Sequence, residues 1–308
     1  MDFSILSALV PIFVIILIGY GLARADFPGS DFWVHAERLT YYLLFPALLL
    51  RSAAVADFGD QIAGQIIPPL IFAVLLMSFL LLILRPKLAV DGPGFTSVFQ
   101  GGIRFNTYIG LAAAFALYGA AGLAVSAVII AVLIPLVNLL SVLVLVRYAR
   151  PSEVHWGRTL LNLFSNPLIL ACLGGILLNL TDLGLPWGSS QVLEILGRAS
   201  LPLGLLAVGA GLSVKSMRST KIVLTASAIL KLIVFPVLMF GACRLVGVEG
   251  MSLSLLVMFA ALPGSASSYI LARQLGGDAN LMASILTLQT AAASVSLPLV
   301  LLGLEALG

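Results

Sequence analysis

Long runs of apolar residues dominate the chain, and short stretches that contain Pro, Gly and Asp separate them. Runs such as 70–84 and 123–146 lack the alternation of apolar and polar positions that is typical of membrane barrel strands. An α-helix needs about 20 apolar residues to cross a bilayer core of about 30 Å. The pattern therefore predicts an all-α membrane protein with ten spans, at about 4–24, 36–54, 63–85, 95–117, 123–146, 159–180, 191–212, 221–244, 251–274 and 280–303.

The two halves of this pattern share landmarks when one is shifted along the other by about 156 residues. The matching landmarks are prolines, one Asn and Gly-containing turns: Pro11 with Pro167, Pro46 with Pro202, Asn106 with Pro263, and 119–122 with 276–278. We therefore expect two five-span repeats, residues 1–150 and 151–308. Because five is odd, the second repeat must enter the membrane in the opposite sense, which gives the inverted repeat of many secondary transporters.

Composition supports a membrane protein and excludes several other classes. Of the 308 residues, 61% are hydrophobic and only 9% are charged, whereas soluble domains carry about 25% charged residues. A soluble enzyme, a disordered protein and a nucleic-acid-binding domain are therefore excluded. The two His fall in predicted loops, the two Cys fall in apolar runs, and no nucleotide-binding loop is present, so we expect no enzyme activity, no metal site and no cofactor.

The distribution of Lys and Arg predicts how the chain is oriented. Of the 16 basic residues, three lie in the even-numbered loops, Arg51, Arg198 and Arg244, and two lie within spans. The other eleven lie in the odd-numbered loops: Arg24, Arg38, Arg85, Lys87, Arg147, Arg150, Arg158, Lys215, Arg218, Lys221 and Arg273. Because basic loops stay in the cytoplasm, we expect both termini outside it, in a bacterial inner membrane.

Spans four and nine contain polar, helix-breaking segments at matching depths. Span four places two glycines before a cation, an amide and hydroxyls, and span nine places Pro and Gly before three serines. Irregular backbone at this depth is tolerated where it lines a cavity, and breaks at corresponding places point to a transport site. The residues predicted to bind substrate here are Arg104, Asn106, Thr107, Tyr108, Pro263, Gly264, Ser265 and Ser267.

Arg104 and Lys231 are cations near the predicted bilayer centre, with no Asp or Glu at the same depth. A charge there costs a few kcal/mol and marks a functional or structural site. We expect Lys231 to offset the negative ends of broken half-helices, which stabilises the crossover, and Arg104 to lie nearer the substrate.

The two half-helix N-termini are expected to offer free N–H groups, and with a nearby cation they would suit an anion, most naturally a carboxylate. Asn138 and Gln289 are further amides within spans. Each is a candidate ligand contact or a hydrogen-bonding link between helices, and the sequence leaves both interpretations open. Tyr41 and Tyr42 are assigned to the interfacial belt rather than to the site.

Several of these motifs together resemble the auxin efflux carrier family of membrane transporters, over nearly the whole chain. The motifs are Pro11-Ile-Phe, Phe45-Pro46-Ala-Leu-Leu, Arg104-Phe-Asn106-Thr, Ile134-Pro135-Leu-Val-Asn138, Asn166-Pro167-Leu, Ser200-Leu-Pro202-Leu, Ala261-Leu-Pro263 and Tyr269-Ile-Leu-Ala-Arg273-Gln-Leu-Gly-Gly-Asp278. The chain looks like a compact prokaryotic member that lacks the long loop of many plant PIN-FORMED proteins. The second break differs from the family pattern, since Gly264 and Ser265 follow Pro263 and no Asn is adjacent.

The resemblance implies an architecture related to bile-acid symporters and sodium/proton antiporters. Spans 1, 2, 6 and 7 would form a scaffold, and spans 3–5 and 8–10 a transport domain that moves like an elevator, with the broken spans four and nine crossing at the site. Family substrates are organic anions such as auxins, malate and malonate, and relatives suggest a homodimer through the scaffold.

Other functions remain open at the level of the sequence. A receptor or regulatory protein that binds a ligand without moving it is the chief alternative, and a channel is the next. The sequence does not show how transport would be coupled to energy. No carboxylate lies deep in a span as a proton or sodium site, which favours uniport or movement driven by the charge of the substrate, and Na⁺ bound by backbone carbonyls at the breaks stays open.

Overall fold

The computed structural model describes residues 2–56, 62–149, 165–181, 183–186, 188–212 and 221–307. The described part of the chain is helical, with short turns between the helices and no β-strand. Of the predictions above, the basic residues Arg150, Arg158, Lys215 and Arg218 and the start of the span at 159–180 fall outside these ranges.

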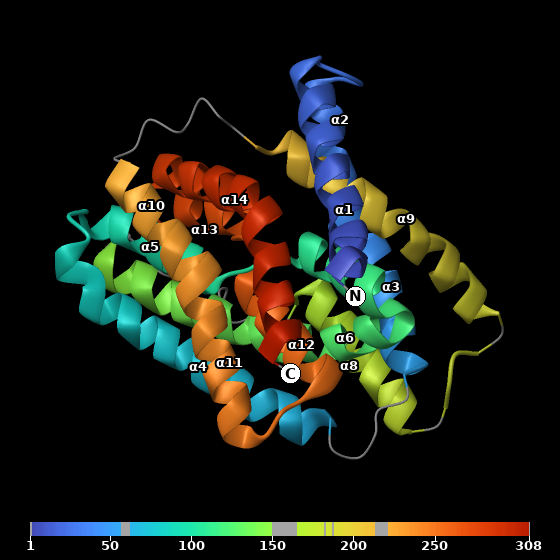
Figure 1. The fold of residues 1–308 in the computed structure, drawn as a ribbon. Coiled ribbons are helices and arrows are strands. Elements are labelled where there is room, and N and C mark those ends of the chain that lie inside the picture. Colours follow the sequence, from blue (N-terminus) through green and yellow to red (C-terminus); the bar gives the residue numbers. More distant parts are fainter. Residues whose placement is uncertain are drawn as a thin grey trace.

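The helices form two groups, and α6 extends from one to the other (Figure 1). One group comprises α1 (Asp2–Arg24), α2 (Ser30–Leu39), α3 (Phe45–Ala54), α8 (Pro167–Leu180) and α9 (Ser189–Ala210). Contacts of α1 with α9, and of α3 with both α8 and α9, hold this group together. The other comprises α4 (Ile62–Leu84), α5 (Gly92–Ile103), α10 (Lys221–Ile229), α11 (Phe235–Val246), α13 (Ala266–Gln274) and α14 (Ala279–Leu307). The long α6 (Thr107–Tyr148) and α12 (Gly250–Ala261) belong to this second group, where α6 contacts α4 and α5 and α12 contacts α11 and α14. Helix α6 also forms its boundary with the first group, since it contacts α1, α3 and α8.

Six helices of the described chain are long and apolar enough to cross a membrane, or seven if α12 and α13 together form one bent span. This number is lower than the ten spans predicted from the apolar runs. Residues 92–148 count once although the helix is interrupted within them, α8 has only 14 residues, and the segment 30–54 is not among the apolar spans. Large apolar side chains remain exposed along these helices, including Leu17, Phe79 and Leu177, as expected for surfaces that face lipid.

Two helices are interrupted in the middle of the molecule. α5 ends at Ile103, and three extended residues, 104–106, precede α6. α12 ends at Ala261, and α13 begins at Ala266 with its axis turned by 46°. The interruptions meet, because the Asn106 N–H donates a hydrogen bond of 2.8 Å to the carbonyl of Pro263. We call residues 104–107 and 262–268 the crossover.

Short polar residues fix where the helices that lead to the crossover begin. The Asp91 carboxylate accepts a hydrogen bond of 2.8 Å from the Gly94 N–H at the start of α5, and Asp278 does the same for Leu281 at the start of α14. The two starts are joined, since the Ser97 hydroxyl donates to the Asp278 carbonyl at 2.7 Å. α5 and α14 therefore begin at the same level of the molecule.

Other irregularities lie within the predicted spans. α2 and α3 are joined by the π-helical turn η1 (Thr40–Leu44), and α10 and α11 by the π-helical turn η4 (Leu230–Val234). Gly119 interrupts α6 with a φ of 59°, a conformation that glycine adopts without the steric cost that other residues meet. This kink falls at the turn predicted between spans four and five.

Candidate functional site

Asn106 closes the beginning of α6 with its own side chain. Its Oδ1 accepts hydrogen bonds from the N–H groups of Tyr108 at 3.0 Å and Ile109 at 3.2 Å. The prediction of free N–H groups at this helix start is therefore wrong, because the Asn cap already uses two of them. The side-chain Nδ2 forms no hydrogen bond among the described residues, so Asn106 keeps one amide donor for a ligand.

Arg104 is a cation buried without a counter-charge. Its side chain is only 6% exposed, and its one hydrogen bond runs from Nη2 to the Ser267 hydroxyl at 2.8 Å, across the crossover. Nε and Nη1 are buried and have no partner in the described structure. A guanidinium needs acceptors for its N–H groups when water is excluded, so this site is incomplete without an anion or another acceptor.

Gln289 of α14 links the two interruptions. Its Oε1 accepts from the Gly264 N–H at 2.9 Å, and its Nε2 donates to the carbonyl of Gly101 at 3.1 Å. Nε2 also lies 3.2 Å from the hydroxyl of Ser227 on α10. The whole side chain is buried, and both ends of its amide are hydrogen-bonded. Of the two interpretations left open for Gln289, the geometry favours the link between helices.

The second interruption has a more open helix start than the first. Ser265 precedes α13 but makes no side-chain cap, and its hydroxyl lies 2.9 Å from that of Ser267. Ser267 is exposed, whereas Thr107 on the facing segment is buried. The expected free N–H groups are thus confined to the start of α13, where Ser267 also holds Arg104.

Aromatic side chains cover the crossover on the side of α3. The ring of Tyr108 stacks on that of Phe45, with 4.7 Å between ring centroids and 14° between planes. Tyr41, in the π-helical turn η1, is half-buried against the hydrophobic core, whereas Tyr42 is 64% exposed. The assignment of the two tyrosines to the interfacial belt stays a prediction. Phe45 was not among the predicted site residues, because an apolar residue in an apolar run gives no signal.

Lys231 and Asn138 are less closely tied to the crossover. Lys231 lies in η4, which packs against α5 and α12, the two helices that end in the interruptions. Its Nζ is buried without a hydrogen-bond partner and lies 4.5 Å from the centroid of the Phe235 ring, a distance typical of a cation–π contact. Asn138 is half-buried on α6, and no hydrogen bond of its side chain joins it to the crossover in the described structure.

The side chains at the crossover are suited to binding a negatively charged group. The crossover offers one guanidinium, one amide donor and the hydroxyls of Ser265 and Ser267. In the described ranges no group of three or more His, Cys, Asp or Glu side chains could hold a metal ion. The donors exceed the acceptors, so a negatively charged group fits this site better than a cation.

Apolar membrane-spanning helices around a buried, donor-rich crossover define a helical integral membrane protein with an internal polar site. Residues 154–301 match the family model described as membrane transport protein, the domain of the auxin efflux carrier family. The second half of the chain is therefore similar to that family, whose members are transporters rather than enzymes. No curated protein matches the sequence. The family match, together with the apolar helices, indicates a membrane transporter.

Proposed function

We propose that the chain is a secondary transporter for a small organic anion and that the crossover binds the substrate. A carboxylate such as an auxin-like acid, malate or malonate would accept hydrogen bonds from Arg104, the Asn106 amide and Ser267. The hydroxyl of Thr107, the ring of Tyr108 and the backbone at Pro263 and Gly264 would line the same site. Asn138 would contribute only if the substrate extends beyond the crossover.

Arg104 is the observation that carries this proposal. A buried guanidinium whose Nε and Nη1 have no partner is costly, and the fold keeps it at the crossover, where it is bound only to Ser267 in the described structure. A bound carboxylate would supply charge and two acceptor oxygens in the bidentate geometry that Arg prefers. The binding free energy of the substrate would then include relief of this cost.

Alternating access by an elevator-like movement is the second part of the proposal. The group of α1, α2, α3, α8 and α9 would be a fixed scaffold, and the remaining helices would carry the crossover past it. The division into two inverted five-span repeats, residues 1–150 and 151–308, agrees with interruptions that fall in α5–α6 and α12–α13 and meet through Asn106 and Pro263. Lys231 would hold the ends of α5 and α12 together during the movement.

We further propose a bacterial inner membrane with both termini outside the cytoplasm, because basic residues concentrate in the odd-numbered loops. A dimer through the scaffold is a further part of the proposal. Coupling to Na⁺ or H⁺ is another, and flux measurements under imposed gradients test it.

The test is uptake into proteoliposomes that contain the purified chain. We expect saturable uptake of one or more radiolabelled carboxylates, inhibited by unlabelled acid and absent from protein-free liposomes. Imposed Na⁺ and pH gradients, applied one at a time, distinguish coupled transport from uniport. Carboxylate binding without uptake under every gradient would contradict a transporter and assign the chain to ligand sensing, while uptake that does not saturate would indicate a channel.

A further inference from the structure

A cavity lies at the boundary between the two groups of helices. It has a volume of about 710 Å³, within the range of pockets that hold drug-sized ligands. Residues of α1, α3 and α9 line one wall, and residues of α6 and α12 line the other. None of the crossover residues is among its lining residues. The cavity is therefore a separate candidate site.

Most of the residues that line this cavity are apolar, and its charged side chains lie together on α3 and α9. The apolar lining includes Leu48, Leu201, Leu205 and Val125, and Ala121 lies beside the kink of α6. The only charged lining residues are Arg51 of α3 and Glu194 and Arg198 of α9. Such a cavity suits a molecule with an apolar body and one polar end.

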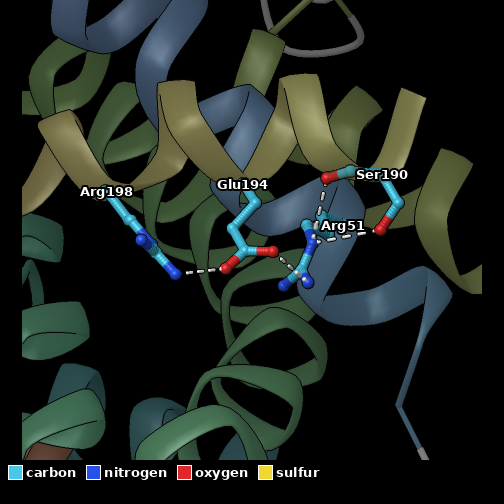
Figure 2. Close-up of polar contacts among 4 residues, drawn as sticks. All are labelled: Arg51, Ser190, Glu194 and Arg198. Carbon is cyan, nitrogen blue, oxygen red and sulfur yellow. Dashed lines mark hydrogen bonds and ion pairs between the residues drawn. The ribbon is translucent and has the colours of Figure 1, made fainter. Parts of the chain in front are cut away.

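The charged group is ordered by an ion-pair chain (Figure 2). Glu194 lies between the two arginines, with 2.8 Å from its Oε2 to Nη2 of Arg51 and 2.5 Å from its Oε1 to Nη2 of Arg198. Arg51 is held further by Ser190, whose carbonyl oxygen accepts from Nε at 3.2 Å. Figure 2 shows Arg198 at the open end of this chain, where its side chain is 78% exposed.

The charge of this group is unbalanced. Two guanidinium groups share one carboxylate, which leaves one positive charge at the cavity. Arg198 uses one N–H toward Glu194 and has no other hydrogen bond in the described structure. A single anionic group beside Arg198 and Arg51 would neutralise the charge, and a cation there would be repelled.

We propose that this cavity binds an amphipathic monoanion, whose apolar body fills the space between α3, α6 and α9 and whose acidic head pairs with Arg198 and Arg51. An amphipathic carboxylate and a lipid with a single negative charge share this chemistry. A ligand with only one of the two parts binds more weakly, since the head alone leaves the apolar walls unfilled and the body alone leaves the charge unpaired.

A consequence for transport follows, and it rests on the proposed function. The occupant contacts α3 and α9 on one wall and α6 on the other, so it fills the boundary across which the elevator would move. It therefore holds the two groups of helices in one arrangement and inhibits flux. Binding is measured apart from flux, so failure of the transport proposal leaves the binding proposal testable.

The experiment measures radiolabelled decanoate bound to the chain in nanodiscs of zwitterionic lipid, with empty nanodiscs as background. We expect saturable binding of decanoate, at least about tenfold weaker binding of decanol, and none of decyltrimethylammonium. Arg198→Gln weakens decanoate binding by about twofold to fivefold, the size of an exposed charge contact. Glu194→Gln raises the positive charge and tightens binding by about threefold.

Two further variants separate the parts of the site. Ala121→Phe fills the cavity, keeps all three charges and abolishes binding. Arg244→Gln, which removes an exposed cation of α11 outside the cavity lining, is the matched control and leaves binding unchanged. Equal binding of decanol and decanoate, or decanoate binding that withstands both Arg198→Gln and Ala121→Phe, would overturn the proposal.

The source of the anion is decided by a second set of nanodiscs that contain phosphatidylglycerol. If phosphatidylglycerol lowers decanoate binding to the unmodified chain but not to Arg198→Gln, the result supports the site and assigns it to a membrane lipid. Unchanged decanoate binding in these nanodiscs supports the site and assigns it to a free acid.

Discussion

At the scale of single residues, the crossover is defined by donors that the fold leaves without acceptors. Arg104 has one hydrogen bond for three nitrogen atoms, and the amide Nδ2 of Asn106 has none in the described structure. Burial removes the water that would otherwise satisfy Nε and Nη1 of Arg104, so these two groups raise the free energy of the empty protein. The same groups favour a ligand that supplies negative charge and oxygen acceptors.

Replacing Arg104 should separate stability from binding. Arg104→Met removes an uncompensated buried charge, so we expect a thermal unfolding midpoint equal to or higher than that of the unmodified chain. Carboxylate affinity should fall by about 30-fold or more, since loss of one partner of a buried charge pair costs about 2–5 kcal/mol. Differential scanning fluorimetry and binding titrations check both. A lower midpoint with unchanged affinity would instead give Arg104 a structural role.

Asn106 has two functions that different substitutions can separate. Asn106→Ser keeps an oxygen that can cap α6 but removes the Nδ2 donor, so we expect near-normal stability and reduced carboxylate affinity. Asn106→Ala removes the cap as well and should lower the free energy of unfolding by about 0.5–2 kcal/mol. Thermal unfolding and ligand titration of the two variants provide the comparison. If both variants bind carboxylate normally, the Asn106 amide does not contact the substrate.

At the scale of helices, the two interruptions depend on a brace from a third helix. Broken backbone inside a membrane protein needs internal hydrogen bonds, because lipid offers none. Gln289 of α14 supplies them on both sides, to Gly264 and to Gly101. Ser227 extends the same link to α10. One side chain therefore sets how four helical segments meet.

Replacing Gln289 should loosen the second interruption. Gln289→Leu keeps similar bulk but leaves the Gly264 N–H and the Gly101 carbonyl unsatisfied, at a cost of about 1–3 kcal/mol for each buried group. We expect a lower unfolding midpoint and faster amide hydrogen exchange at residues 262–265. Ser227→Ala, which leaves both of those backbone partners intact, should have a smaller effect. Normal exchange at 262–265 in Gln289→Leu would show that the brace is dispensable.

At the scale of the whole molecule, the contact between Phe45 and Tyr108 joins the two groups of helices beside the crossover. Phe45 belongs to α3 and Tyr108 to the first turn of α6, and their rings stack at 4.7 Å. Within the first group, α1 and α9 approach closely, since a Cβ on Gly209 would collide with the backbone of Ile16. This close packing suits a rigid scaffold, and the aromatic stack suits a boundary that can slide.

Cross-linking across this boundary tests the movement. The background chain has Cys172 and Cys243 changed to Ser, and the test variant adds Phe45→Cys and Tyr108→Cys. After treatment with a short bis-maleimide, we expect this variant to lose flux while the protein stays folded and monodisperse. The pair Leu50→Cys and Gly174→Cys, which are neighbours on α3 and α8 within the first group, is the control and should keep flux after treatment. Full flux across the locked Phe45–Tyr108 boundary would exclude an elevator between these groups.

Local sequence predicted the features that depend on local chemistry. The interruptions at 104–106 and 262–265 fall where Gly, Pro and polar residues disturb an apolar run, because these residue types destabilise a helix wherever they occur. The ten-span, two-repeat architecture goes beyond the six or seven apolar spans of the described chain and stays a prediction. Hydrogen-bond partners could not be predicted from the sequence. Asn106 caps α6 and Gln289 of α14 braces the two interruptions, and residue types alone do not choose between a cap, a brace and a ligand contact.

The sequence by itself determined that this chain is a helical membrane protein with a cation at the centre of a broken helix, because apolar length and buried charge are properties of each segment. Only the tertiary structure decided which groups meet. Arg51 and Glu194, 143 positions apart in the chain, form an ion pair at an apolar cavity that no local pattern predicts. Likewise, Arg104 meets Ser267 because separate helices converge there. Contacts between distant segments depend on packing, and packing is settled by all the helices together.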